Sequence, residues 1–232
     1  MILEGKNVCM ETLLSGQKIK KVIMKESFND EIIQIVQKRN ISFEFLNDFE
    51  FQKLYPKAQG IVIEVEGYVY ESFDKALDNL SPKPFVLILD GIEDPQNFGN
   101  IIRSFEALGG DFIIIPKNRA CGVNETVARV SSGAFNYVKI VQVTNLNTAI
   151  AFLKDYGFWI AGADMKGDTL YDQLPVDTPL ALVIGSEGFG ISHLVRQNCD
   201  YLIRIPMTGK INSLNASISA AIIMSNIISR RK

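Results

Sequence analysis

Polar side chains that could bind or activate a substrate gather in three short segments, each of which directly follows an apolar run. The segments carry carboxamides, carboxylates, hydroxyls and one arginine, namely Asp94, Asn97 and Arg103, then Glu187, then Ser213 and Asn215. Such groups can hold a hydroxyl or an amine through hydrogen bonds, and an arginine can clamp a phosphate with two parallel bonds. We therefore expect a binding site in which these three segments meet.

The chain contains one histidine, His193, which removes much hydrolytic and metal chemistry. A Ser/His/Asp triad would have to be built on this residue, and a metal site with several histidines is impossible. The three cysteines, Cys9, Cys121 and Cys199, lie far apart without a CxxC motif, which argues against a zinc site and a disulfide framework. We expect His193 to be an ordinary polar residue near a helix start, and catalysis to proceed without histidine or metal.

The second segment, GSEGFGIS (185–192), combines three glycines with one carboxylate. Glycines where a strand turns into a helix let a ligand approach backbone N–H groups closely. The spacing is G-x-x-G-x-G rather than the dinucleotide-binding G-x-G-x-x-G, which disfavours a nicotinamide cofactor. Glu187 would repel a phosphate, so it suits a ligand rich in hydroxyl or amine donors, or a cap on a neighbouring loop.

The other two segments each precede a predicted helix. A loop that runs through Gly99 leads into a helix on which Arg103 lies near the start and points toward the carboxyl edge of the sheet. The alternative is a surface arginine paired with Asp94 or Glu106. In the third segment, Asn212 or Ser213 can cap the last helix, whose small residues (216–221) would equally suit a tight packing seam.

The elements that must position these residues fall into two parts. Strand patterns at 20–24, 41–45 and 60–66, with a helix capped by Ser27, predict a small α/β domain. Residues 81–84 read Ser-Pro-Lys-Pro, which suits an extended connector. Beyond it, apolar strands alternate with helices, a pattern that predicts a parallel sheet covered on both faces. We expect domains at 1–70 and 85–232 with a linker at 71–84.

Composition limits the partners of the chain. Hydrophobic residues make up 47% of the 232 positions and charged residues 22%, which fits soluble domains with real cores. With neither a leader pattern nor a long apolar segment, we expect a cytoplasmic protein that neither is secreted nor spans a membrane. A net charge of −2 means that any nucleic-acid contact must be local. The candidate clusters are Lys18, Lys20 and Lys21, and the tail Arg230, Arg231 and Lys232, although a solvated strand edge and a helix dipole would explain them as well.

The three segments together resemble the SpoU, or TrmH, family of RNA ribose 2′-O-methyltransferases. Its motifs are similar to Asp94-Pro95, Asn97, Gly99 and Arg103; to Gly185-Ser186-Glu187-Gly188 with Gly190; and to Ile205-Pro206-Met207, Gly209 and Ser213-Leu214-Asn215. Ser132-Gly133-Ala134 is similar to a further family segment. Residues 1–67 resemble the substrate-binding domain that precedes the methyltransferase in ribosomal-RNA members, except that Ala58 stands where the family often has histidine.

The resemblance implies an α/β-knot (SPOUT) domain with a deep trefoil knot, which binds S-adenosylmethionine between the knotted loops and acts as a homodimer. It implies a catalytic polar centre of Arg103, Asn97, Glu187 and Asn215, and cofactor contacts at Gly185, Ile205, Met207, Ser213 and Leu214. RNA contacts would come from Lys18, Lys20, Lys21 and Arg103. The expected substrate is a ribose 2′-hydroxyl in RNA of the 23S ribosomal type, with guanosine as a candidate nucleotide. A transfer-RNA 2′-O-methyltransferase and a non-catalytic RNA-binding or ribosome-assembly protein are the alternatives, and a nucleotide-dependent oxidoreductase is a more distant one.

Overall fold

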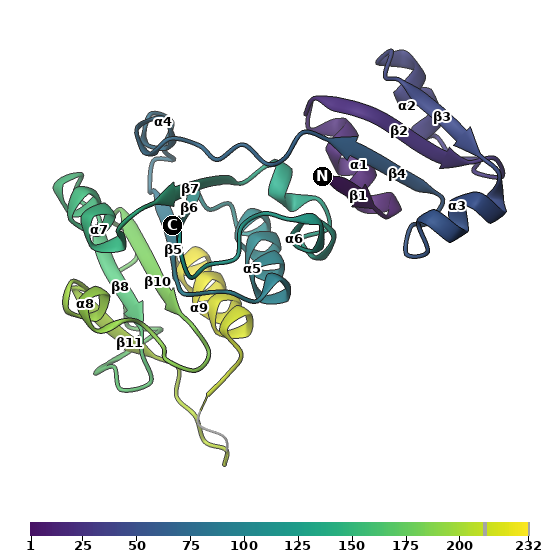
Figure 1. The fold of residues 1–232 in the computed structure, drawn as a ribbon. Coiled ribbons are helices and arrows are strands. Elements are labelled where there is room, and N and C mark those ends of the chain that lie inside the picture. Colours follow the sequence, from purple (N-terminus) through teal and green to yellow (C-terminus); the bar gives the residue numbers. More distant parts are fainter. Residues whose placement is uncertain (211–212, 232) are drawn as a thin grey trace. The chain divides into compact units, whose positions relative to one another are not determined.

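The computed structural model describes residues 1–210 and 213–231, which form two compact units (Figure 1). The first unit contains Met1–Val69 together with Gly122–Tyr137, and the second contains Tyr70–Cys121 and the chain from Val138 onward. Residues 122–137 lie within the expected second domain by sequence, yet they pack with the first unit. No described helix is both long and apolar enough to cross a membrane.

The first unit is a small α/β fold around a four-stranded sheet. Its elements are β1 (Ile2–Glu4), α1 (Lys6–Leu14), β2 (Ile19–Lys25), α2 (Ile32–Lys38), β3 (Phe43–Leu46), α3 (Asp48–Leu54), β4 (Ile61–Val65), α6 (Glu125–Val130) and the 3₁₀ turn η1 (Ala134–Asn136). The sheet order is β1-β4-β2-β3, with antiparallel pairs except between β2 and β3.

The expected cap at Ser27 is wrong. The helix begins later, at α2, where a carboxylate oxygen of Asp30 accepts from the backbone N–H of Ile32 at 3.2 Å. Ser27 instead donates through its hydroxyl and its backbone N–H to Asp48, the first residue of α3. A serine can cap a helix only where its hydroxyl faces that helix, and here a neighbouring carboxylate binds it.

The second unit confirms the predicted α/β class with a mostly parallel sheet. Its elements are α4 (Phe73–Leu77), β5 (Phe85–Asp90), α5 (Pro95–Ala107), β6 (Phe112–Pro116), β7 (Lys139–Val143), α7 (Leu146–Asp155), β8 (Trp159–Ala163), β9 (Thr169–Leu170), β10 (Leu180–Gly185), α8 (His193–Gln197), β11 (Tyr201–Arg204) and α9 (Ala216–Arg230). The strand order is β7-β6-β5-β10-β8-β11-β9, and every pair is parallel. The trefoil knot stays a prediction.

Helices cover both faces of this sheet, which explains its continuous apolar strands. On one face, α4, α7 and α8 pack with the strands in one hydrophobic cluster, while on the other α5 packs against α9 (Figure 1). Residues 85–89 of β5 are almost wholly inaccessible to water. Chain order reverses between the neighbours β5 and β10, and such a switch point is where open α/β sheets bind ligands.

The starts of α5 and α9 correct two expectations about the polar segments. Helix α5 already begins at Pro95, capped by Asp94, so Gly99 lies buried within the helix rather than in a loop. Proline at the first helical position is favoured because its missing N–H would have no partner there. Helix α9 is capped by Asn215 and not by Ser213, and Asn212 lies outside the described residues. His193 begins α8, as predicted.

Candidate functional site

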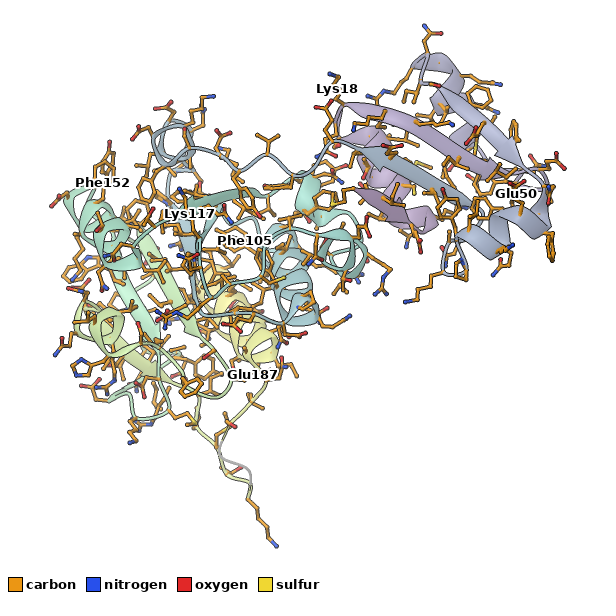
Figure 2. All side chains as sticks on the ribbon, viewed as in Figure 1. Lys18, Glu50, Phe105, Lys117, Phe152 and Glu187 are labelled. Atoms are coloured by element: carbon orange, nitrogen blue, oxygen red, sulfur yellow. The ribbon has the colours of Figure 1, made fainter. Side chains whose placement is uncertain are left out.

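Asn97, Glu187 and Asn215 form one hydrogen-bonded cluster, which we call the polar centre. The Asn97 side-chain amide donates to Glu187 Oε1 at 3.0 Å. The Asn215 amide donates to Asn97 Oδ1 at 2.8 Å and also to Glu187 Oε1. Glu187 is labelled in Figure 2, beside the start of α9. The structure therefore brings together three of the four predicted catalytic residues, from segments that are far apart in sequence.

The central strands bring two of these residues together. Strands β5 and β10 pair in parallel up to the couple Asp90 and Gly185, so the segments that follow them leave the sheet side by side. The Asp90 carboxylate accepts from the backbone N–H of Ser192 at 2.7 Å and ties the end of the glycine turn to β5. Asp94 caps α5 by accepting from the N–H of Asn97 at 2.9 Å. Asn97 is consequently held in the first turn of α5, with only 7% of its surface exposed.

Asn215 joins the polar centre to the last helix. Its Oδ1 accepts from the backbone N–H of Ser217 at 2.9 Å and from the Ser217 hydroxyl at 2.7 Å. Since the oxygen is used in this cap, the amide nitrogen is directed at Asn97 and Glu187. The N–H of Ala216 also points at Glu187 Oε1, at 3.4 Å. A carboxylate beside a helix N-terminus is favoured by the helix dipole, so the start of α9 helps to hold the Glu187 side chain in place.

The glycine turn that carries Glu187 is tightly folded. A Cβ at Gly185 would lie 2.0 Å from the carbonyl carbon of Gly190, a distance that no side chain tolerates. The backbone carbonyl of Ser186 accepts from the N–H of Gly190 at 2.8 Å and closes the turn. Gly190 adopts a φ of +66°, in the left-handed region that favours glycine. At these two positions, glycine is required for the turn itself.

Arg103 does not join the polar centre. It lies six residues after Asn97, which turns its side chain about 120° around the helix and moves it about 9 Å along the axis. The side chain is exposed and makes no hydrogen bond or ion pair with any described residue, so neither Asp94 nor Glu106 neutralises it. The helix nevertheless presents this guanidinium from the same element that holds Asn97.

The predicted cofactor residues come from strands that lie next to one another. Strand β8 pairs with β10 on one side and with β11 on the other, so the segments after all three leave the same edge of the sheet. Gly185 ends β10, and Ile205 and Met207 follow β11. Met207 and Leu214 are each about one third exposed, and Ser213 is exposed. The described residues on both sides of positions 211–212 are therefore largely exposed to water, and the segment enters the polar centre at Asn215.

Two family sequence models together cover most of the chain. The model of the SpoU rRNA Methylase family matches residues 84–225. A second model, described as RNA 2′-O ribose methyltransferase substrate binding, matches residues 2–71. The chain belongs to the SpoU rRNA methylase family.

Relatives of this SpoU family member match it along almost their whole length. The Bacillus subtilis protein YacO, named a TrmH family tRNA/rRNA methyltransferase, is 38% identical over 98% of this chain and 94% of its own. The SpoU methyltransferase AviRb from Streptomyces viridochromogenes, solved with AdoMet, has a TM-score of 0.85 over 99% of this chain and 90% of its own, at 21% identity. An AdoMet-bound rRNA methyltransferase from Sinorhizobium meliloti has a TM-score of 0.81 over 97% of this chain and 85% of its own, at 22% identity. These solved structures share the fold.

One polar residue at the sheet edge of this SpoU family member, Asp164, was not identified from the sequence. Asp164 follows β8 and binds the Arg196 guanidinium, with Oδ2 2.6 Å from Nε. Partial burial opposes ionisation, but the N–H of Lys166 and the charge of Arg196 outweigh it and hold the pKa of the Asp164 carboxyl below its usual range. The carbonyl of Gly167 accepts from Arg204 at 2.6 Å, which ties the same turn to β11. An acidic residue directly after the apolar run FWIAGA was the available signal.

The predicted RNA-binding lysines of the first unit each face a carboxylate. Lys18 Nζ lies 3.7 Å from a carboxylate oxygen of Glu66, Lys20 Nζ lies 3.8 Å from one of Glu64, and Lys21 Nζ lies 2.7 Å from one of Glu44. Exposed pairs of this kind contribute only about 0.2 to 1 kcal/mol, so a phosphate can compete for the lysines. Their role in RNA binding stays a prediction.

Arg231 of the predicted tail cluster, and Ala58 at the position of the family histidine, are both used in packing. In the tail, the Arg231 guanidinium donates to the carbonyls of residues 83, 84, 176 and 178, while Lys232 lies outside the described residues. Ala58, in place of the family histidine, packs half-buried against the cluster of Ile23, Phe51 and Val62.

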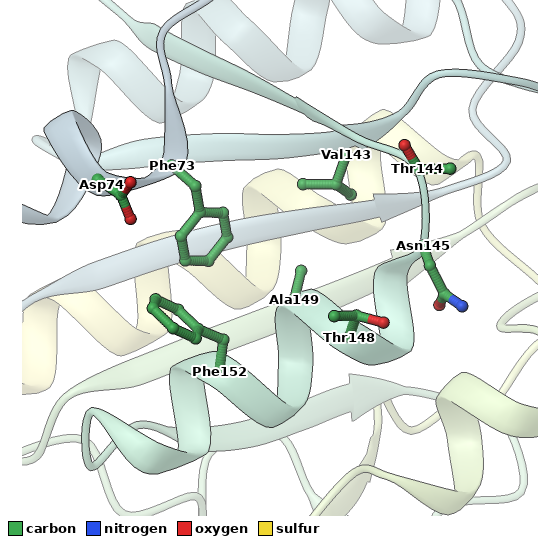
Figure 3. Close-up of a pocket in the computed structure, with 8 residues that line it drawn as sticks. All are labelled: Phe73, Asp74, Val143, Thr144, Asn145, Thr148, Ala149 and Phe152. Carbon is green, nitrogen blue, oxygen red and sulfur yellow. The ribbon is translucent and has the colours of Figure 1, made fainter.

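A separate hollow of about 410 Å³ opens between α4 and α7. It is lined by Phe73, Asp74, Val143, Thr144, Asn145, Thr148, Ala149 and Phe152 (Figure 3). The rings of Phe73 and Phe152 meet edge to face at 5.3 Å. None of the predicted site residues lines this hollow, so it is distinct from the polar centre.

Proposed function

We propose that this chain transfers a methyl group from S-adenosylmethionine to a ribose 2′-hydroxyl in RNA. The observation that carries the proposal is the convergence of Asn97, Glu187 and Asn215 at the edge where β5 and β10 end. Membership of the SpoU rRNA methylase family and the two AdoMet-bound neighbours support it.

The residues around this edge fit the cofactor. Ile205, Met207 and Leu214 offer apolar surface for an adenine, and a Cβ at Gly188 would meet nothing within 4 Å, so the turn leaves room for a ligand. The Glu187 carboxylate complements the positive charge of a sulfonium. Bound S-adenosylmethionine supplies an electrophilic methyl group: its S–C bond breaks as an O–C bond forms, which leaves a neutral thioether, and the hydroxyl proton leaves to solvent or phosphate.

Arg103 is the residue that we assign to the substrate side. A guanidinium stays protonated at neutral pH and is a poor general base, but it can clamp a phosphate with two parallel bonds. Because the side chain is exposed and pairs with no carboxylate of the described residues, it can take an RNA phosphate without first breaking an ion pair there. Held next to the ribose, the same charge would stabilise the alkoxide that develops during transfer.

We propose ribosomal RNA of the 23S type as the substrate, with guanosine as the candidate nucleotide. The match of residues 2–71 to a substrate-binding model supports a separate RNA-reading domain at 1–70, joined through 71–84 to the catalytic domain at 85–232. YacO is named for both RNA classes, so transfer RNA is the second candidate. We further propose that the protein acts as a cytoplasmic homodimer.

A transfer assay with tritiated S-adenosylmethionine tests the proposal. The substrate is ribosomal RNA from a strain that lacks this gene, and nucleoside analysis by mass spectrometry locates the methyl group on ribose or base. Arg103→Ala should lower the rate at least 100-fold while titration calorimetry finds cofactor affinity largely retained. Glu106→Ala, one turn further along the exposed side of α5, is the matched control and should retain activity.

Three outcomes would reject parts of the proposal. Methyl groups found on bases would reject the 2′-hydroxyl as the target. Equal losses of turnover and cofactor affinity in Arg103→Ala would reject the substrate role of that residue. RNA binding without any transfer by the unmodified protein would favour the non-catalytic alternative.

A further inference from the structure

Phe189, at the tip of the glycine turn, has 96% of its surface exposed. It is the most exposed of the large apolar side chains in the part of the chain that the structure describes. A phenylalanine this exposed buries almost no apolar surface within the chain, so nearly the whole ring is free to pack against a partner. The turn has no charged residue besides Glu187.

The turn is braced, so it presents the ring from a defined place. The Glu187 carboxylate is held by Asn97 and Asn215, and the backbone between Ser186 and Gly190 is closed by a 2.8 Å hydrogen bond. Beyond the turn, the N–H of Ser192 binds the carboxylate of Asp90. Because both ends are fixed, little backbone entropy remains to be lost when a partner packs on the ring.

We propose that Phe189 stacks on the nucleobase of the nucleotide to be methylated, or on the base next to it. This inference rests on the proposed function. The Cα atoms of Glu187 and Phe189 are two residues and so at most about 7 Å apart, which places the ring on the same short turn as the polar centre. The base and the ribose of one nucleotide are joined directly, so a ribose bound at the polar centre for methylation places its base close to the same turn. An uncharged aromatic face suits any base, because every base has a π-face.

The test compares Phe189→Ala, Phe189→Trp and Leu194→Ala in methyl transfer to ribosomal RNA from a strain that lacks this gene. Stacking of one base on an aromatic ring predicts a loss of kcat/KM for RNA of about 5- to 100-fold in Phe189→Ala. Phe189→Trp keeps a stacking face and should stay within about 3-fold of the unmodified protein. Leu194→Ala removes another exposed apolar side chain (62% exposed) from the first turn of α8 and should change nothing.

Calorimetry with S-adenosylmethionine and sedimentation of each variant complete the design. Unchanged cofactor affinity and an unchanged oligomeric state, with weaker RNA use, support stacking. Full kcat/KM in Phe189→Ala would overturn the stacking proposal, and so would a parallel loss of cofactor affinity. A changed oligomeric state would also overturn it, because the ring would then pack on a second copy of the chain. If the unmodified protein methylates no ribose, the proposed function fails; if it does so and Phe189→Ala is equally active, only this inference fails.

Discussion

Asn215 has two separable duties, and its replacement should expose both. Its Oδ1 caps α9, and its amide donates to Asn97 and to the Glu187 carboxylate. An N-cap is worth about 1 kcal/mol, and a hydrogen bond to a charged group about 1.5 to 3 kcal/mol. We expect Asn215→Ala to lower the free energy of unfolding of the second unit by about 3 kcal/mol.

Asn215→Ser separates the two contributions. Its hydroxyl can still cap α9 but cannot reach Asn97 and Glu187 with two donors, so about 1 kcal/mol of the loss should return. Asn226→Ala is the control on the same helix. Among the described residues, the Asn226 side chain makes one weak hydrogen bond, in which its Oδ1 accepts from Arg230 at 3.4 Å, so the variant should stay within about 0.5 kcal/mol of the unmodified protein.

Urea unfolding followed by the fluorescence of Trp159 measures these differences. This residue is the chain's one tryptophan and lies in β8, so it reports on the second unit. If Asn215→Ala unfolds within 0.5 kcal/mol of the unmodified protein, the polar centre does not hold α9 in place. If the Ser and Ala variants are equally stable, the capping contribution is absent.

Four further predictions concern stability and reactivity. Gly185→Ala should destabilise the second unit by about 3 kcal/mol in urea unfolding, since its Cβ would overlap the backbone of the turn; a stable variant would contradict that crowding. Arg231→Gln should lower the free energy of unfolding, measured by thermal unfolding, by about 2 to 4 kcal/mol because several backbone carbonyls lose a charged donor. Arg230→Gln is the control and should change it little. Equal effects of the two variants would contradict the structural role of Arg231. The lowered pKa of the Asp164 carboxyl contributes stability that is present above its unfolded pKa near 4 and is lost as the pH falls through its folded pKa. Asp164→Asn should therefore weaken the fall in the urea midpoint of unfolding as the pH is lowered. An unchanged fall at acid pH would contradict this prediction. Burial raises the pKa of the Cys9 thiol to about 12, so native protein at pH 8 should show no alkylation at Cys9 by mass spectrometry, and rapid labelling would mean that the first unit opens.

The second sheet was predictable because its strands carry a strong local signal. Runs such as FVLIL and LALVI are buried on both faces, and a strand of that kind can be recognised without knowledge of its neighbours. The family resemblance that the three motifs carry also named the three residues of the polar centre, but it included Arg103, which does not join them. The order in which the strands pair was not predictable, because no feature of the β10 sequence indicates that this strand lies between β5 and β8.

The caps and the helix start show where sequence reasoning fell short. Ser27 has the residue type of a cap, but its hydroxyl binds Asp48, a partner 21 residues away. Gly99 resembles a loop residue, yet the cap at Asp94 and the proline after it start α5 earlier. In both cases the outcome depends on a contact or a neighbouring signal that outweighs intrinsic preference.

Residues 122–137 have a consequence for any attempt to transplant the front of this protein. Glu125 accepts the backbone N–H of Ile2 at 2.8 Å, the Asn136 amide donates to Thr12, and Phe135 is completely buried. A chimera cut after residue 70 would leave out residues 122–137, which complete the first unit, and would expose the apolar surface that they cover. Recombination between relatives in this family must therefore exchange two stretches of gene at once, which makes the front module far less portable than its place at the chain's beginning suggests.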